Sequence, residues 1–252
     1  MRVRKNKALE KAMADREHRG QPKEDKDIDI QGEYAYVAEP YGNYAHKNEG
    51  KAILLVSDSL GLCYNSRLLA DQFAGARYLT GVPNYTGRLT PPTSELTCLA
   101  EVIPSRSPEK RHTTLINAIE YMYSRAVNQI AAAGYSTGGT ELLTLLRVGR
   151  YSKIGFVAQP EAYTPDDFKE LEGPLSLVLG DEDDATPQEA RFEIETYLMK
   201  GGGYPYQINL YSHVGRGFSS NRAVKSKAGV YAKKQSFIQA LQWSEEHLHN
   251  GD

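Results

Sequence analysis

A serine between two glycines is the strongest chemical feature of the chain. Gly134, Ser136 and Gly138 form a Gly-x-Ser-x-Gly pattern between the apolar run 127–133 and a helical pattern over 140–148. Small flanking residues let a strand turn sharply into a helix, so that the serine hydroxyl stands exposed above the helix N-terminus in a strained conformation. The helix dipole and free amides then face a reacting carbonyl. The context predicts a nucleophile elbow, and the alternative is a glycine-rich turn with an incidental serine.

The elements around this corner predict an α/β protein. Short apolar runs have the length of buried strands, and several are separated by segments whose apolar residues recur every three or four positions. This alternation is typical of a mostly parallel central sheet flanked by helices. The expected strands are 34–37, 52–56, 78–82, 127–133, 154–158, 175–179 and 206–211, and the expected helices are 115–125, 140–148, 189–200 and 233–247. We expect one domain over 28–252 after a charged N-terminal extension, 1–27.

Composition narrows the classes of partner. Lys plus Arg number 30 against 32 for Asp plus Glu, so the formal charge of -2 gives no basic footprint for nucleic acid. The two cysteines form no CxxC pair, and no cofactor or metal is implied. The charged N-terminus does not resemble a secretory signal, and no apolar run reaches membrane-spanning length. We expect a cytoplasmic protein that binds a small-molecule substrate, with no nucleic acid and no membrane partner, and leave a homodimer open.

Several blocks of sequence resemble the dienelactone hydrolase family. Residues 134–139, Gly-Tyr-Ser-Thr-Gly-Gly, are similar to the family's Gly-x-Cys-x-Gly-Gly elbow. In the expected order, other blocks look like its first core strand, oxyanion loop and next helix, especially in the fungal branch, then its Pro-Asp-Leu-Tyr-x-Arg strand end, acid-bearing strand and histidine loop. These blocks are 54–74, 82–88, 177–187 and 211–218. The resemblance spans residue 30 to the C-terminus and implies an α/β-hydrolase fold.

The resemblance also implies roles for individual residues. Ser136 stands in the position of the nucleophilic cysteine, and Asp183 in that of the acid that orients the histidine. Backbone amides of Ser59 and Thr137 would form the oxyanion hole. Candidate substrate-binding residues are Asp58, in the position of an acid that interacts with the resting nucleophile, Arg88 and Arg222, as carboxylate clamps or plain surface arginines, and Tyr135, near the expected pocket edge.

The catalytic base departs from the family pattern. Arg216 occupies the position of the histidine, and a guanidinium cannot give up its proton in a protein. Facing Asp183, it would form an ion pair and leave the serine unactivated. His213 lies three residues earlier, and a bulge in this glycine-containing loop could swing it toward Ser136. Sequence alone leaves both arrangements open.

Three functions follow from these observations. The first is an enzyme of secondary or aromatic metabolism that acts on a small carbonyl compound, such as a lactone, an ester or a polyketide-derived enol, by hydrolysis with Ser136 as the nucleophile where the substrate has an acyl bond. The second keeps the fold without hydrolysis, because an oxyanion hole beside the cation of Arg216 would stabilise an enolate in a cyclase, isomerase, decarboxylase or carbon–carbon lyase. The third is a pseudoenzyme or binding protein, favoured by the missing histidine.

Overall fold

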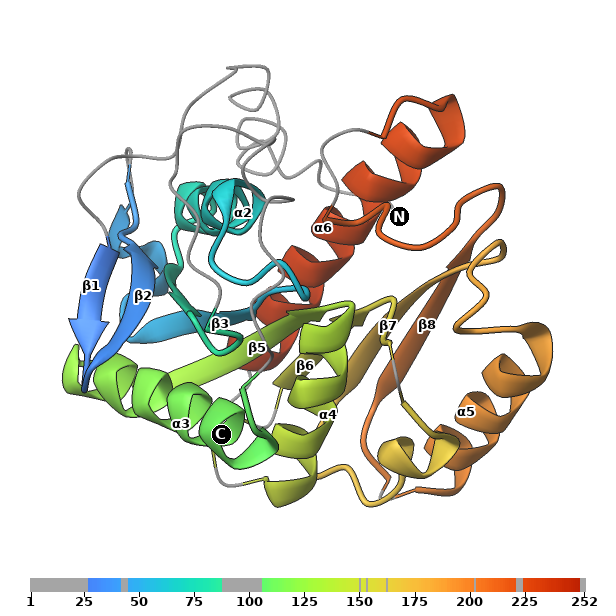
Figure 1. The fold of residues 1–252 in the computed structure, drawn as a ribbon, viewed down its shortest axis with the longest axis horizontal. Helices are drawn as coiled ribbons and strands as arrows, with labels where there is room; N and C mark the ends of the chain where they lie inside the picture. Colours follow the sequence, from blue (N-terminus) through green and yellow to red (C-terminus); the bar gives the residue numbers. More distant parts are fainter. Residues whose placement is uncertain are drawn as a thin grey trace.

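A computed structural model describes residues 27–41, 45–87, 106–149, 151–152, 154–161, 163–201, 203–220 and 224–249. Within these residues the chain forms one eight-stranded sheet (Figure 1). Its strands are β1 (Asp27–Ile30), β2 (Glu33–Ala38), β3 (Lys51–Val56), β4 (Leu79–Pro83), β5 (Gln129–Tyr135), β6 (Ile154–Ala158), β7 (Leu175–Gly180) and β8 (Tyr206–Tyr211).

The sheet is mostly parallel, as the sequence predicted. Its strand order is β1-β2-β4-β3-β5-β6-β7-β8. The β1–β2 and β2–β4 pairs are antiparallel, and every other pair is parallel. The carboxyl ends of β3, β5, β6 and β7 therefore lie along one edge of the sheet, the place where open α/β sheets bind ligands.

Helices cover both faces of this sheet (Figure 1). Side chains of β3 alternate between the faces: Ile53 and Leu55 belong to a core with α2 and α6, whereas Leu54 belongs to a core with α3 and α4. This period of two follows from the pleat of a strand buried on both sides. The helices are α2 (Tyr64–Gly75), α3 (Pro108–Ser124), α4 (Thr137–Val148), α5 (Gln188–Lys200) and α6 (Lys227–His249), with 3-10 turns η2 (Ala45–Asn48) and η4 (Pro165–Phe168).

Several element boundaries differ from the prediction. Strand β1 was missed, and its first residue, Asp27, was assigned to the extension, because this short strand is buried only at Ile30 and shows little apolar signal. Helix α3 begins at Pro108 rather than 115, since its first turns are exposed and polar. The Ser107 side chain accepts a hydrogen bond from the Lys110 amide there and caps the helix.

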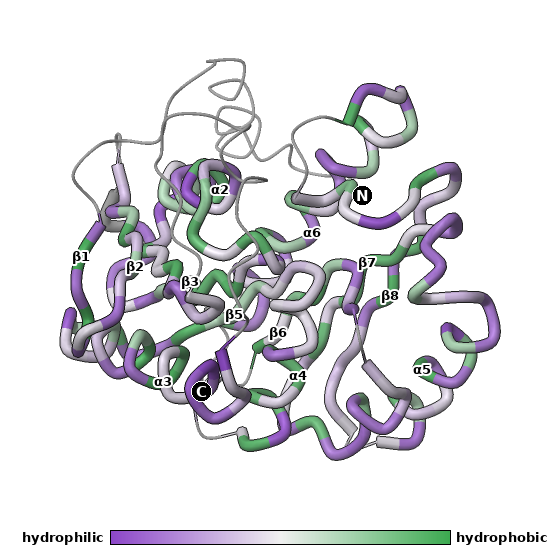
Figure 2. Tube along the Cα trace, viewed as in Figure 1, coloured by the Kyte–Doolittle hydropathy of each residue, from purple (hydrophilic) through white to green (hydrophobic). Residues whose placement is uncertain are grey.

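Hydropathy along the chain agrees with this layering. Figure 2 shows hydrophobic stretches along the central strands, whereas the covering helices alternate between hydrophobic and hydrophilic residues. Such alternation is expected of helices with one face on the core and one in solvent. In the part of the chain that the structure describes, none of the helices combines the length and the apolar character needed to cross a bilayer.

Candidate active site

Ser136 occupies a strained corner between β5 and α4. Its backbone has φ 53° and ψ −120°, a region that non-glycine residues rarely adopt. The Ser136 amide donates to the carbonyl of Ala158 at the end of β6, which anchors the corner to the neighbouring strand (2.9 Å). Strain of this kind costs about 1–3 kcal/mol and persists only where the surroundings enforce it.

Two glycines make the corner sterically feasible. A Cβ atom added at Gly138 would lie 2.2 Å from the carbonyl oxygens of both Val56 and Ser57. One added at Gly134 would lie 2.5 Å from the carbonyl oxygen of Gly138. Both distances are shorter than real Cβ contacts, so the first turn of α4 can pack against the ends of β3 and β5 only because these side chains are absent.

The Ser136 hydroxyl is bonded to a carboxylate that the sequence interpretation missed. Its Oγ donates to Oε2 of Glu161 at 2.6 Å, so the side chain does not cap α4. Glu161 lies three residues beyond β6, and its backbone carbonyl accepts a hydrogen bond from the Thr140 hydroxyl on α4. The only available signal was positional: β6 pairs with β5 in parallel, so a residue just beyond β6 should lie near the end of β5.

Arg216 joins this carboxylate to a second one. Its Nη1 donates to Oε1 of Glu161 at 2.9 Å, and its Nε donates to Oδ1 of Asp183 at 3.3 Å. The Asp183 side chain is fully buried and also accepts from the Ala185 amide, whereas the Arg216 side chain is 43% exposed. A chain of contacts therefore runs from Asp183 through Arg216 and Glu161 to the hydroxyl of Ser136.

A buried glutamine fixes the loop that carries Arg216. Gln159 follows β6 with a φ of 53°, and its side-chain amide donates to the carbonyl of Gly215 at 2.8 Å. Its side-chain oxygen accepts from the Ser219 amide at 3.4 Å. Both ends of the segment around Arg216 are thus tied to Gln159, the residue that follows β6 and lies two positions before Glu161.

The loop after β3 lies beside the elbow. The backbone of Asp58, Ser59, Leu60 and Gly61 turns sharply, closed by a bond from the Gly61 amide to the Asp58 carbonyl (2.9 Å). The buried hydroxyl of Tyr85 donates to the Ser57 carbonyl at 2.8 Å. Ser59 lies three residues beyond β3, and Thr137 lies two residues beyond β5. Because β3 and β5 are paired in parallel, both residues follow neighbouring strand ends at the same edge of the sheet.

Asp58 contacts its own loop and a distant serine. Its Oδ1 accepts from the Leu60 amide and its Oδ2 from the Ser220 hydroxyl, at 3.0 and 3.2 Å. Burial raises the pKa of Asp58, and the nearby negative charge of Glu161 adds to the rise, against the lowering effect of both hydrogen bonds. The carboxylate that contacts the resting Ser136 is Glu161, which takes the place the resemblance implied for Asp58.

Two other predicted site residues lie elsewhere. The side chain of His213 is 82% exposed, with Nδ1 3.6 Å from Oε1 of Glu182, so of the two arrangements that the sequence left open, the swing of His213 toward Ser136 is not found. Its φ of 58° belongs to the turn after β8, which directs the ring outward. Tyr135 is 2% exposed and packs its ring on Phe156 in the core, because it still belongs to β5. Arg88 and Arg222 lie outside the described residues.

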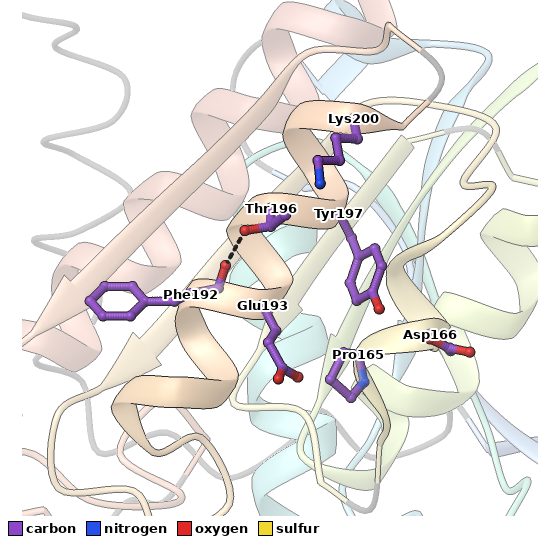
Figure 3. A pocket seen from close by; sticks show the side chains of 7 residues that line it. All are labelled: Pro165, Asp166, Phe192, Glu193, Thr196, Tyr197 and Lys200. Atoms are coloured by element: carbon purple, nitrogen blue, oxygen red, sulfur yellow. Dashed lines mark hydrogen bonds between the residues drawn. The ribbon is translucent and has the colours of Figure 1, made fainter.

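A groove in the described residues lies away from the elbow. It runs between α5 and η4 and contains none of the residues bonded to Ser136. Figure 3 shows side chains of both elements along it, with the ring of Phe192 pointing away from η4. Its lining residues are Pro165, Asp166, Phe192, Glu193, Thr196, Tyr197 and Lys200.

The similarity of the chain to known proteins shows which family it belongs to. The model of the dienelactone hydrolase family matches residues 34–248, and the chain belongs to that family. The chain is 33% identical over 217 residues to the hydrolase pyvD of Aspergillus violaceofuscus, covering 84% of this chain and 86% of that protein. It is 28% identical over 239 residues to dienlactone hydrolase 1 of Gibberella moniliformis, covering 90% and 88%.

A solved structure agrees on the fold. A Klebsiella pneumoniae protein described as a dienelactone hydrolase superposes with a TM-score of 0.71 at 17% identity, covering 87% of this chain and 97% of that one. The α/β-hydrolase fold predicted from the sequence is therefore confirmed.

Proposed function

We propose that the protein hydrolyses a small carbonyl compound, a lactone or an ester, with Ser136 as the nucleophile. The observation that carries the proposal is the strained backbone of Ser136, whose hydroxyl is turned away from its own helix and held 2.6 Å from a carboxylate. A serine with only a structural role at a helix start would gain more by capping the helix amides. Membership of a hydrolase family supports the same reaction.

The attack uses groups from two strand ends. Oγ of Ser136 forms a bond to the carbonyl carbon, and the π electrons of that carbonyl move onto its oxygen. The Thr137 amide belongs to the first turn of α4, where amides have no partner within the helix, and can donate to this oxyanion. The Ser59 amide, on the loop beyond β3, would be the second donor.

The substrate class for hydrolysis is the lactone or ester that the sequence indicated, because a polyketide-derived enol has no acyl bond to cleave and would suit only non-hydrolytic enolate chemistry. Collapse of the tetrahedral intermediate expels the alkoxide, and water then releases the acid, so a lactone would open to a hydroxy acid. The relatives support this class through their hydrolase and dienlactone hydrolase names, which describe those proteins.

A second candidate function is non-hydrolytic enolate chemistry. It is favoured by the guanidinium of Arg216, which stands 2.9 Å from the Glu161 carboxylate and cannot serve as a base. In this version the carboxylate would remove an acidic C–H proton of the substrate, and the cation and oxyanion donors would hold the enolate. Ser136 would then only donate a hydrogen bond.

One experiment separates these functions. The full chain and Ser136→Ala are treated with a fluorophosphonate and analysed by intact mass and peptide mapping, and both are assayed on aryl esters and simple lactones. We expect an adduct on Ser136, and loss of both adduct and turnover in Ser136→Ala. Hydrolysis that survives in Ser136→Ala would contradict Ser136 as the nucleophile. Neither adduct nor turnover of these esters and lactones in the unmodified protein would contradict hydrolysis and favour the enolate enzyme, which cleaves no ester.

A further inference from the structure

We infer that Glu161 is the general base that activates Ser136, an inference that rests on the proposed hydrolytic function. Its Oε2 accepts the hydrogen bond from the Ser136 hydroxyl at 2.6 Å, within the reach required for direct proton transfer. Glu161 is 31% exposed on its side chain, so it is neither buried in the core nor free in solvent.

Other titratable groups near the elbow are bonded elsewhere. In the described part of the chain, Glu161 is the one titratable side chain with a hydrogen bond to the Ser136 hydroxyl. Oδ1 of Asp183 accepts from Arg216 and the Ala185 amide, and Asp58 accepts from Leu60 and Ser220. His213 faces Glu182 and solvent. Proton acceptance at this hydroxyl therefore falls to Glu161.

Arg216 is a positioning residue in this arrangement. It binds Oε1 of Glu161 and leaves Oε2 to the serine, so the two carboxylate oxygens have separate partners. Asp183 in turn holds Arg216 through Nε, as an acid holds a histidine in a triad. Compared with a triad, this row of contacts has one more member. It runs from the Asp183 carboxylate through the Arg216 guanidinium and the Glu161 carboxylate to the Ser136 hydroxyl, and the proton-accepting group lies just beyond β6.

The proton and electron balance closes with water as the only co-reactant. As Oγ of Ser136 bonds to the carbonyl carbon, its proton passes to Oε2 of Glu161. The intermediate collapses, the bond to the leaving alkoxide breaks, and that oxygen takes the proton from Glu161. Water then attacks the acyl-serine and gives a proton to Glu161, which returns it to Oγ as the acid departs.

The test compares two carboxylates in the same region. Pseudo-first-order rates of fluorophosphonate labelling are measured for the full chain, Glu161→Gln and Glu182→Gln, with Ser136→Ala as the blank. Loss of a general base costs about 10²–10⁴-fold, so we expect at least a hundredfold slower labelling in Glu161→Gln. Glu182 is on the exposed turn beside His213, and Glu182→Gln should label within twofold of the unmodified protein.

Chemical rescue separates catalysis from folding. Glu161→Gly leaves room beside Ser136 for a small carboxylate, so added sodium formate should accelerate its labelling in proportion to concentration, whereas lost structure would not be restored. Labelling of Glu161→Gln within threefold of the unmodified protein, or no rescue by formate, overturns the role of Glu161 while hydrolysis at Ser136 stands. No labelling of the unmodified protein overturns both.

Discussion

The elbow around Ser136 and the loop around Arg216 meet in one site but follow different rules. In the elbow, Gly134 and Gly138 lie so close to neighbouring backbone that no larger residue fits at either position. In the loop, Gly217 has a φ of 81° and no atom of the described residues within 4 Å of an added Cβ, so space does not restrict a side chain at that position. Packing thus protects the geometry of the nucleophile, whereas the loop can accommodate an arginine in place of a histidine.

Glycine-to-alanine substitutions in the elbow and in the loop should differ most strongly in the free energy of unfolding that they cost. Gly138→Ala places a Cβ 2.2 Å from two carbonyl oxygens, and we expect the free energy of unfolding to fall by about 3 kcal/mol, the upper part of the range for overpacking. A Cβ at Gly217 lies within 4 Å of no atom among the residues that the structure describes, so Gly217→Ala should lose only about 1 kcal/mol, for its left-handed backbone. Urea denaturation of both variants checks this, and equal losses would contradict the comparison.

The fold was largely predictable because it depends on local patterns. Apolar runs of strand length and helical periodicity predicted the sheet and most of its helices, and the Gly-x-Ser-x-Gly pattern between a strand and a helix predicted the elbow. The strand β1 and the polar first turns of α3 escaped because their residues are exposed and carry little apolar signal. These elements are held by strand pairing and by capping instead.

The site was predictable only in part because its base comes from another strand. Ion pairing of Arg216 with Asp183 followed from charge and alignment, and the structure shows it at 3.3 Å. Glu161 contacts Ser136 only because β6 pairs with β5 and its end accepts the Ser136 amide. Nothing in the local pattern around Glu161 distinguishes it from the other 31 acidic residues among the 32 in the chain.

Gln159 should matter next most, since it ties the Arg216 loop to β6. Gln159→Ala removes the donor to Gly215 and the acceptor of Ser219, leaving both backbone groups without these partners. A buried group left unsatisfied costs about 1–3 kcal/mol, and we expect the free energy of unfolding to fall by about 2 kcal/mol. Thermal and urea unfolding measure this change, and an unchanged midpoint would show that the loop does not depend on Gln159.

Asp58→Asn should produce a smaller, pH-dependent gain. Because the pKa of Asp58 is raised in the folded state, the folded protein binds a proton that the unfolded chain releases. Its contribution to stability therefore falls as pH rises from the unfolded value, about 3.9, through the raised folded value. Asn keeps the shape and does not ionise, so the variant should be more stable than the unmodified protein at pH 8.

Unfolding in urea between pH 4 and pH 8 measures this gain. The advantage of Asp58→Asn over the unmodified protein should shrink toward pH 4. A variant that is less stable at pH 8 would show that the charged form of Asp58 is favoured by its surroundings.

His213 should have the smallest effect of all. Its side chain is 82% exposed, and its Nδ1 lies 3.6 Å from Oε1 of the exposed Glu182. Surface changes of this kind usually stay within about 0.5 kcal/mol, and His213→Ala should keep both its unfolding midpoint and its rate of fluorophosphonate labelling. A labelling rate reduced tenfold or more would show that His213 takes part in activating Ser136 and would contradict the comparison of the loop with the elbow.

The most direct test of the central claim is the pH dependence of Ser136 labelling in the unmodified protein. A free imidazole titrates near 6.5, so an imidazole base would lose about tenfold in rate between pH 7.5 and pH 5.5. Because Glu161 rather than an imidazole accepts the hydrogen bond from the Ser136 hydroxyl, we expect no tenfold fall in the fluorophosphonate rate with a midpoint of about 6.5 over that interval. A tenfold fall with a midpoint near 6.5 would contradict it.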